Sequence, residues 1–415
     1  MRSHKSLIVA VLLILALAFP AQMQDDALEI WVTGGENDAT TLQAAAASFI
    51  EETGIDVVVE YVDWGDAYSR YLTAVNSGTG ADMYAGGMSW GISLGGIGGL
   101  VDLSQAEFAG EVQEVLDGNN PEFVKGIIGV DGAIYGVPYN QDVMVMYYLK
   151  DNLAQVGFEN PPATWEELDA ALAALQEAGL GTGGFGWGNA DWISFQQFLA
   201  QAGGSWYNED CSASAINSEE GLTALEFYTT LYDEYGFPQE AASTAGFSTG
   251  EISILFEGEW AALGIDPSYP ELEGKWAIAP VPAGPAGNNA SFVGGKGIGI
   301  FSYSDKVDEA WQFIKWLQTA DAAQAIIDGN FNLSSLWLPP QPANAELIAG
   351  GEELSLPIAE QLSSTTPPPN CPGWEESNPD IRLALQSVLF EGAAFEDALA
   401  EMQEILDAAL MTYGG

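Results

Sequence analysis

The sequence predicts an α/β protein with two compact units joined by crossing segments. First, residues 28–62 show a strand–helix–strand pattern, which predicts a parallel sheet with a right-handed crossover. Second, in residues 131–149 two apolar strand patterns flank the polar side chains Asn140, Gln141 and Asp142. Third, the glycine-interrupted apolar run at 290–301 resembles a return crossing. Polar side chains at a crossing between two units are expected to line a cleft.

The elements before the first crossing alternate between strands and helices. We expect strands at 28–33, 55–62 and 81–85, helices at 39–52 and 67–77, and a glycine-rich loop at 86–99. Ligands of open α/β sheets bind at the carboxyl ends of the strands. Glu36, Asp38 and Trp90 fall at such ends.

The elements after the first crossing are mostly helices. Thr164 and Glu167 form a capping box that starts a helix at 165–178. Residues 181–188 contain a formal GxGxxG, but the run follows a helix and has no basic residue nearby, so we interpret it as a loop. Further helices are expected at 193–202, 218–235, 307–318, 320–327, 379–390 and 395–409, and strands at 250–256 and 276–281.

Composition bounds the class of protein. The chain has 415 residues, enough for two or more domains, and is 47% hydrophobic. Its 59 acidic and 10 basic residues leave a net charge of −49. This charge repels phosphate backbones and anionic lipid, so we expect no nucleic-acid partner. Most of the carboxylates are interpreted as solvated surface.

Residues 1–24 are expected to be a secretory signal peptide. Arg2, His4 and Lys5 precede the apolar run 7–19, which is short for a membrane span. No cysteine follows the run, so a lipoprotein site is missing. We therefore expect a soluble exported protein in the periplasm or at the cell surface.

The mature chain holds few groups for catalysis. Removing the signal peptide removes His4, the one histidine, so no Ser-His-Asp triad and no histidine-ligated zinc site can form. We expect no catalytic residues, no metal and no cofactor. Cys211 and Cys371 are expected to form a disulfide in an exported chain, with two free thiols as the alternative.

Three segments carry a family resemblance. They hold SGTGAD (77–82) and GLVDL (99–103); IYGVPY (134–139), YYLKD (147–151) and PATWEEL (162–168); and FEGEWA (256–261), VPAGP (281–285), FVGG (292–295) and AWQFIKWL (310–317). In this order and spacing they resemble the extracellular solute-binding proteins of ATP-binding-cassette importers, of the maltose-binding-protein type. The resemblance covers almost the whole mature chain.

The resemblance implies the two-lobed periplasmic-binding-protein fold of type II, in which each lobe has a mostly parallel sheet flanked by helices. Lobe one would comprise residues 25–139 and 294–336, and lobe two residues 140–293 and 337–415. The hinge segments would lie near 138–143 and 292–297. The ligand would bind in the cleft between the lobes, and the expected partners are this ligand and the permease subunits of the importer. We expect a monomer.

The resemblance also implies a set of ligand-binding residues. Asp142 stands where members carry a carboxylate after the hinge proline, and Trp260 where they carry an aromatic after a strand-end glycine. Together with residues chosen for their places at strand ends, in loops and at the crossing, the full set of candidates is Glu36, Asp38, Ser89, Trp90, Asn140, Asp142, Asp191, Trp192, Glu257, Trp260, Gly294 and Trp374. Lys296 is either a ligand contact or an ion-pair partner. The first loop lacks the lysine that members often carry there.

The chemistry of the candidates leaves three functions open. Tryptophan faces and carboxylate or amide groups suit a sugar, because they stack on its C–H surface and bind its hydroxyls. The same groups suit a polyamine or another organic cation through cation–π contacts and charge pairing. A secreted glycosidase would need a defined carboxylate pair, and none stands out. We expect a carbohydrate-binding importer component with no enzymatic activity.

Overall fold

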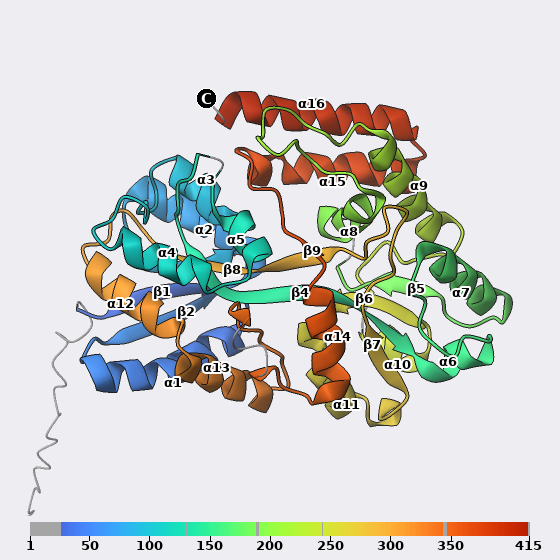
Figure 1. The fold of residues 1–415 in the computed structure, drawn as a ribbon, viewed down its shortest axis with the longest axis horizontal. Helices are drawn as coiled ribbons and strands as arrows, with labels where there is room; N and C mark the ends of the chain where they lie inside the picture. Colours follow the sequence, from blue (N-terminus) through green and yellow to red (C-terminus); the bar gives the residue numbers. More distant parts are fainter. Residues whose placement is uncertain (1–25, 130, 188–190, 243, 343–346, 414–415) are drawn as a thin grey trace, which may run out of the picture.

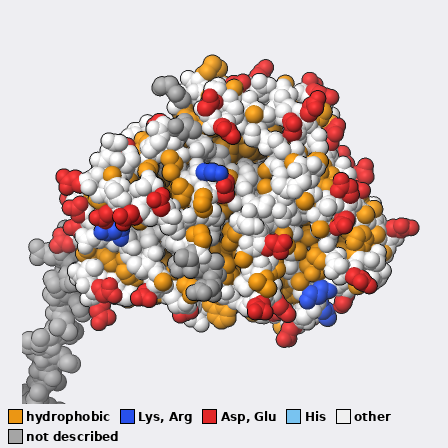
Figure 2. Space-filling view, in the orientation of Figure 1, with side chains coloured by type: hydrophobic (Ala, Val, Ile, Leu, Met, Phe, Trp, Pro, Cys, Tyr) orange, Lys and Arg blue, Asp and Glu red, His pale blue; other side chains and the backbone are white. Residues whose placement is uncertain are grey.

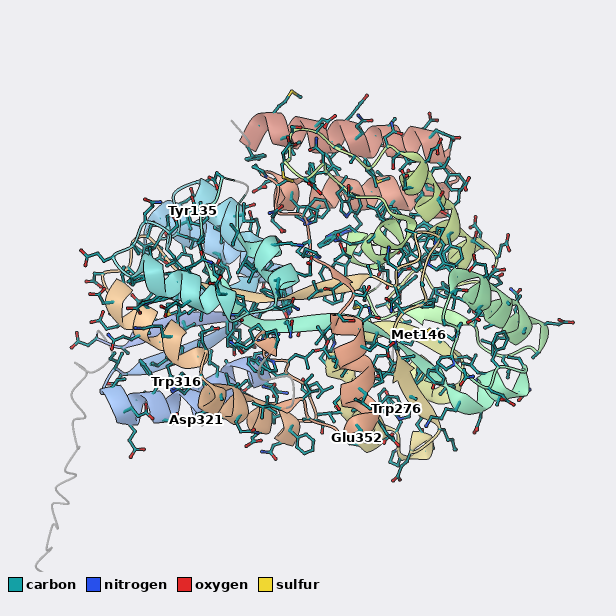
Figure 3. The ribbon with its side chains drawn as sticks, viewed as in Figure 1. Tyr135, Met146, Trp276, Trp316, Asp321 and Glu352 are labelled. Carbon is teal, nitrogen blue, oxygen red and sulfur yellow. A yellow bond between two sulfur atoms is a disulfide. The ribbon has the colours of Figure 1, made fainter. Side chains whose placement is uncertain are left out.

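The computed structural model describes residues 26–129, 131–187, 191–242, 244–342 and 347–413. The expected signal peptide lies outside these residues. The chain forms two lobes, one on each side of a pair of long strands (Figure 1). Tyr135 and Trp316 lie in lobe one, and Met146 and Trp276 in lobe two (Figure 3).

Lobe one is built on three parallel strands. They are β1 (Leu28–Thr33), β2 (Val57–Val62) and β3 (Met83–Gly87), with β1 between the other two. The helices are α1 (Glu36–Thr53), α2 (Trp64–Ser77), α3 (Trp90–Gly96), α4 (Ala109–Asp117), α5 (Pro121–Ile127), α12 (Val307–Leu317) and α13 (Ala320–Asn332). The predicted βαβ unit is therefore present. The glycine-rich stretch at 86–99 is not simply a loop, because its centre forms α3.

Lobe two has a mixed sheet and most of the helices. Its strands are β5 (Gly183–Phe185), β6 (Ile254–Gly258) and β7 (Trp276–Ala279); β5 is parallel to β6. Its helices are α6 (Lys150–Gln155), α7 (Trp165–Glu177), α8 (Trp192–Ala202), α9 (Glu219–Asp233), α10 (Thr244–Thr249), α11 (Ala262–Ser268), α14 (Glu352–Leu362), α15 (Trp374–Glu391) and α16 (Phe395–Tyr413), with short 3-10 turns η1 (Glu259–Ala261) and η2 (Pro270–Leu272). β6 and β7 both run antiparallel to the strand between them, β4 (Val137–Leu149). The parallel arrangement expected for this lobe therefore holds only for β5 and β6.

Two strands run through both lobes and join them into one sheet. β4 (Val137–Leu149) and β8 (Ser291–Ile300) are antiparallel neighbours in the strand order β2-β1-β3-β8-β4-β6-β5. β9 (Thr365–Thr366) pairs with β8 near its start. The prediction of two separate strands on either side of residues 140–142 is wrong, because β8 pairs with β4 there and the strand continues. The irregularity is a register shift between Pro138 and Asn140, which follows from the missing N–H of proline.

A third segment, which includes Leu338 and Pro339, crosses between the lobes. It connects α13 to α14 and lies against β4. The Gln141 backbone N–H donates to the Leu338 carbonyl (3.1 Å), and the Gln141 side chain donates to the Pro339 carbonyl (2.8 Å). The junction between the lobes is therefore three segments wide.

Acidic side chains are scattered over the visible face of the molecule, and basic ones are few (Figure 2). None of the helices in the described part of the chain has the length and apolar character needed to cross a membrane.

Candidate functional site

A cavity of about 430 Å³ lies where both lobes meet the crossing segments. Lobe one contributes the loop between β1 and α1, the start of α2 and the end of α13. Lobe two contributes the residues after β5 and η1, and β4 and β8 form the wall between them. The lining residues are Gly34, Gly35, Glu36, Asn37, Asp38, Trp64, Asn140, Asp142, Trp187, Trp260, Lys296, Asn330, Ser335, Leu336 and Trp337.

The β1–α1 loop is folded back onto the first turn of α1. Asp38 accepts a hydrogen bond from the Gly35 backbone N–H (2.9 Å), which binds a free N–H at the helix start. Gly34 has a φ of +146°, and a Cβ there would lie 2.4 Å from an Asp38 carboxylate oxygen. Glycine is therefore required at position 34 for this carboxylate to turn toward the cavity.

Lys296 brings the cavity its one cation among the lining residues. Its Nζ lies 3.0 Å from Asp38 Oδ1, and its side chain is 8% exposed. The ammonium also lies 5.8 Å from the centre of the Trp64 ring, within cation–π range. Lys296 is thus an ion-pair partner and a cavity residue at once.

Asp142 sits in a crowded acidic environment. Burial raises its pKa to about 6, and Asp38 adds to the rise, whereas Lys296 and a hydrogen bond from Asn140 (2.8 Å) oppose it. The fully buried Glu259 lies behind it and accepts the Val143 backbone N–H (2.8 Å). Burial and the Asp142 charge hold the pKa of Glu259 well above its usual range. The cavity wall can therefore hold a proton near neutral pH.

Tryptophan rings supply the apolar surface of the cavity. Trp187 and Trp260 meet edge to face with ring centres 5.5 Å apart. Trp64, across the cavity on α2, is 44% exposed. Trp337 comes from the third crossing segment and packs edge to face on Tyr139 (5.9 Å). These rings lie in both lobes and at the junction, so a ligand in the cavity would touch aromatic surface from both sides.

Two buried polar atoms of the cavity residues have no protein partner. Asn140 is 2% exposed, and its Oδ1 accepts no hydrogen bond; Trp337 is 6% exposed, and its Nε1–H has no acceptor. Leaving a buried donor or acceptor unpaired costs about 1–3 kcal/mol. An unpaired acceptor and an unpaired donor fit a ligand group, such as a hydroxyl, that can both donate and accept.

Five of the candidate residues from the sequence line the cavity, namely Glu36, Asp38, Asn140, Asp142 and Trp260. The other candidates are not among its lining residues.

Several of the other candidates have structural roles nearby. Trp90 packs edge to face on Trp64 at 5.5 Å, behind the cavity wall. The Ser89 hydroxyl donates to Glu375 instead of facing the cavity. Gly294 is buried opposite Asp142 in the β4–β8 ladder. These positions follow from α3 and β8, which turn the side chains or backbone away from the cavity.

The candidates on α8, β6 and α15 lie in the fold of lobe two. Asp191 caps α8 by accepting the Ile193 N–H (3.2 Å). Trp192 and Trp374 are 8% and 1% exposed and pack edge to face at 4.9 Å, which makes both of them core residues. Glu257 accepts the Gly258 N–H (2.7 Å), and burial raises its pKa to about 7.

Three tryptophans of the cavity were missed at the sequence level. Trp64 follows the end of β2, so the strand-end rule that selected Glu36 would also have selected it. Trp187 follows β5, which was hidden in the glycine-rich run interpreted as a loop. Trp337 precedes Pro339, in a crossing segment that no strand or helix pattern marks.

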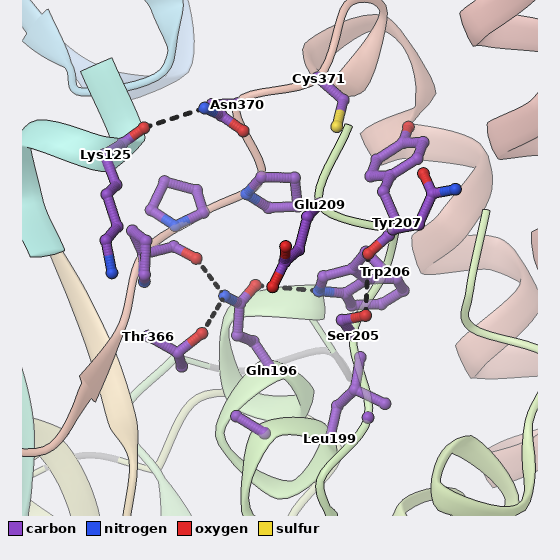
Figure 4. Close-up of a pocket in the computed structure, with 16 residues that line it drawn as sticks. Lys125, Gln196, Leu199, Ser205, Trp206, Tyr207, Glu209, Thr366, Asn370 and Cys371 are labelled. Atoms are coloured by element: carbon purple, nitrogen blue, oxygen red, sulfur yellow. Dashed lines mark hydrogen bonds between the residues drawn. The ribbon is translucent and has the colours of Figure 1, made fainter. Parts of the chain in front are cut away.

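A second cavity of about 430 Å³ lies between α5, α8 and the segment 366–371 (Figure 4). Its central polar side chain, Gln196, is already paired. It accepts from Trp206 Nε1 (2.9 Å) and donates to the Thr366 hydroxyl (3.0 Å) and to the Pro367 carbonyl. Both N–H groups and the carbonyl oxygen of Gln196 therefore have protein partners.

Cys211 and Cys371 are joined in a disulfide with a Cα–Cα distance of 5.5 Å. Within the described ranges, no group of three or more His, Cys, Asp or Glu side chains could hold a metal ion.

The fold and the cavity between its lobes define a solute-binding protein of the type II class. The profile of bacterial extracellular solute-binding proteins matches residues 33–324. The chain therefore belongs to this family, and the resemblance to the maltose-binding-protein type of importer components is confirmed.

Known relatives match over nearly the full length. A binding protein of Brucella abortus is 28% identical over 98% of this chain and 99% of its own. The sugar-binding protein MalE of Xanthomonas citri has a TM-score of 0.79 at 22% identity, over 93% of this chain and 98% of its own. The cyclic alpha-maltosyl-1,6-maltose binding protein of Arthrobacter globiformis has a TM-score of 0.76 at 26% identity, over 93% and 99%.

Proposed function

We propose that this protein captures a carbohydrate in the cavity between its lobes and delivers it to the permease of an ATP-binding-cassette importer. The observation that carries the proposal is the set of four tryptophans, Trp64, Trp187, Trp260 and Trp337, around one cavity that also holds carboxylates and an amide. Flat apolar rings stack on the C–H faces of sugars, and the polar groups bind the hydroxyls. The relative from Arthrobacter globiformis, which binds a cyclic maltosyl-maltose, supports a sugar ligand.

The polar groups of the cavity match hydroxyls in more detail. Asn140 Oδ1 and Trp337 Nε1–H are an unused acceptor and donor. Asp142, which accepts a hydrogen bond from the Asn140 side-chain amide (2.8 Å), is a further acceptor of the cavity. Lys296 adds a charged donor. We assign ligand contacts to these residues and to Trp260.

The lobes would carry the ligand by closing over it. We propose that lobe one comprises residues 25–139 and 294–336, that lobe two comprises residues 140–293 and 337–415, and that the hinge lies near 138–143 and 292–297. The third crossing at Leu338 and Pro339 belongs to the same junction. Closure around a small ligand shifts the population toward the closed form in proportion to the ligand's preference for it.

A second ligand class is favoured by one observation. Glu36, Asp38 and Asp142 outnumber Lys296 among the charged lining residues, so the cavity carries excess negative charge when Asp142 is ionised. Such a cavity attracts a polyamine or another organic cation.

Thermal-shift screening separates the two ligand classes. Purified protein is heated with maltose, maltotetraose, lactose or spermidine, since a ligand that binds the native state raises the melting temperature. A shift with a sugar, absent in the Asp142→Ala variant, supports the proposal. A shift with spermidine and with none of the sugars overturns it, as does turnover of an oligosaccharide by the protein.

A further inference from the structure

The segment 370–376, here called the strap, leads into α15 in lobe two and reaches across to lobe one. The Asn370 side-chain amide donates to the backbone carbonyls of Lys125 and Ile128, both at 3.0 Å. These carbonyls end α5, where the helix itself leaves acceptors unpaired. Lobe two thus supplies the C-terminal cap of a lobe-one helix.

The other end of the strap makes two more contacts with lobe one. The Ser89 hydroxyl at the start of α3 donates to the Glu375 carboxylate, and the Tyr68 hydroxyl of α2 donates to Glu376 (3.0 Å). All of these contacts to lobe one are polar and local.

The strap is fixed to lobe two by stronger attachments. Cys371 is bonded to Cys211, and Trp374 is 1% exposed with its ring against Trp192 and Trp206 at 4.9 and 5.3 Å. When the lobes separate, the strap must therefore stay with lobe two and break its hydrogen bonds to lobe one.

Glu375 is the half-buried acid of the strap at this junction, whereas Glu376 is exposed. Ser89 donates to one oxygen of its carboxyl group and the Asn378 amide to the other (3.1 Å). Burial raises the pKa of Glu375 to about 7; Glu376 adds to the rise, and hydrogen bonds from Ser89 and Trp90 oppose it. No Lys or Arg contributes to this pKa. The facing Tyr68 stays neutral, because burial and Glu376 raise its pKa above the usual value.

We propose that the strap is a closure latch between the lobes, and that its hold on lobe one strengthens in acid because the half-buried Glu375 packs against Ser89 with no cation beside it. The inference rests on the lobe closure of the proposed function but not on the identity of the ligand. In an open form Glu375 would be solvated, with an ordinary pKa near ~4.3. The closed form then binds the proton more tightly, so the closed fraction rises as pH falls through about 7.

Small-angle X-ray scattering of the purified, ligand-free protein at constant ionic strength tests the latch. Between pH 8 and pH 5.5, the wild-type radius of gyration should fall, because the closure constant rises roughly 10- to 30-fold. Glu375→Gln carries a permanently neutral group of the same size. It should have the compact radius at both pH values.

Three further variants separate the roles within the latch. Glu396→Gln removes one exposed charge from α16 of the same lobe and should respond to pH as wild type does. Glu376→Gln should keep a smaller response, because Glu376 adds to the rise of the Glu375 pKa and accepts the hydrogen bond from Tyr68. Asn370→Ala should be more open at both pH values with the response retained. A wild-type radius that does not change with pH, or an equal change in wild type and Glu375→Gln, overturns the inference even if a sugar binds.

Discussion

Lys296 Nζ lies 3.0 Å from Asp38 Oδ1, so the crossing strand β8 is tied to the first turn of α1 by an ion pair with one largely buried partner. The pair holds the ammonium group at the cavity, and the charge of the ammonium group opposes the rise of the Asp142 pKa. Asp38 and Asp142 therefore both depend on this one cation.

Lys296→Met should lower the free energy of unfolding by about 1–3 kcal/mol, because it leaves Asp38 without its ion-pair partner. The loss stays in this range because Asp38 is 30% exposed and water can solvate its carboxylate. Urea denaturation at pH 7 measures the change. The matched control is Lys315→Met, whose pair with Glu111 is exposed on both sides, so its loss should change the free energy of unfolding less than Lys296→Met does. Equal losses in the two variants would contradict a special role for Lys296.

Asp142 should make the protein less stable at alkaline pH. Its folded-state pKa of about 6 lies above the usual value, so its contribution to stability is present in full below pH ~4 and is lost as the pH rises through about 6. Asp142→Asn should therefore raise the free energy of unfolding at pH 8 by about 1–3 kcal/mol and change it little at pH 4.5. Denaturation at pH 4.5, 6 and 8 gives the slopes, and identical slopes for variant and wild type would show that Asp142 is not buried as described.

Gly258 should control the position of Trp260. A Cβ at position 258 would lie 2.0 Å from the Trp260 ring, so Gly258→Ala must displace the ring. We expect at least a roughly tenfold loss of affinity for the sugar that gives the largest thermal shift, measured by calorimetry, since stacking area is lost. Gly110→Ala on α4, which meets nothing within 4 Å, is the control. Unchanged affinity in Gly258→Ala would place the sugar away from Trp260.

The disulfide should contribute strongly to stability. Cys211 and Cys371 are 160 residues apart, and closing a loop of this length restricts the unfolded chain. The double variant Cys211→Ser/Cys371→Ser should lose about 2–5 kcal/mol of unfolding free energy. Reductant should lower the melting temperature of the wild type to about that of the double variant, and it should leave the melting temperature of the double variant unchanged. A wild-type melting temperature that is indifferent to reductant would contradict the prediction.

The sequence predicted the fold best where side-chain periodicity was strong. The unit β1–α1–β2 and the helices α7, α9 and α12 appear within a few residues of their expected bounds, because each buries one regular face. β5 was missed because Gly183, Gly184 and Phe185 offer almost no side-chain alternation. The prediction of two strands in place of the continuous β4 was wrong, because the pairing of β4 with β8 is a long-range contact that local polarity does not reveal.

The site was predictable only in part. Residues at strand ends and at the crossing, such as Asp38 and Asp142, line the cavity. Trp374 was a candidate because it was expected in a loop or at the end of an element, yet it packs in the core against Trp192 of α8, three residues after the disulfide-bonded Cys371. A tryptophan in an irregular segment looks the same in sequence whether its ring faces a ligand or a neighbouring helix.

The continuity of β4 and β8 through both lobes determines which motions the junction allows. Bending this two-stranded ribbon within the plane of the sheet would stretch the hydrogen bonds along one edge, whereas twisting it about its long axis leaves them intact. Twisting of this ribbon and bending out of the sheet plane are therefore the easier motions of the lobes. The deformation that moves the lobes is thus spread along the paired residues of both strands and is not concentrated at one position.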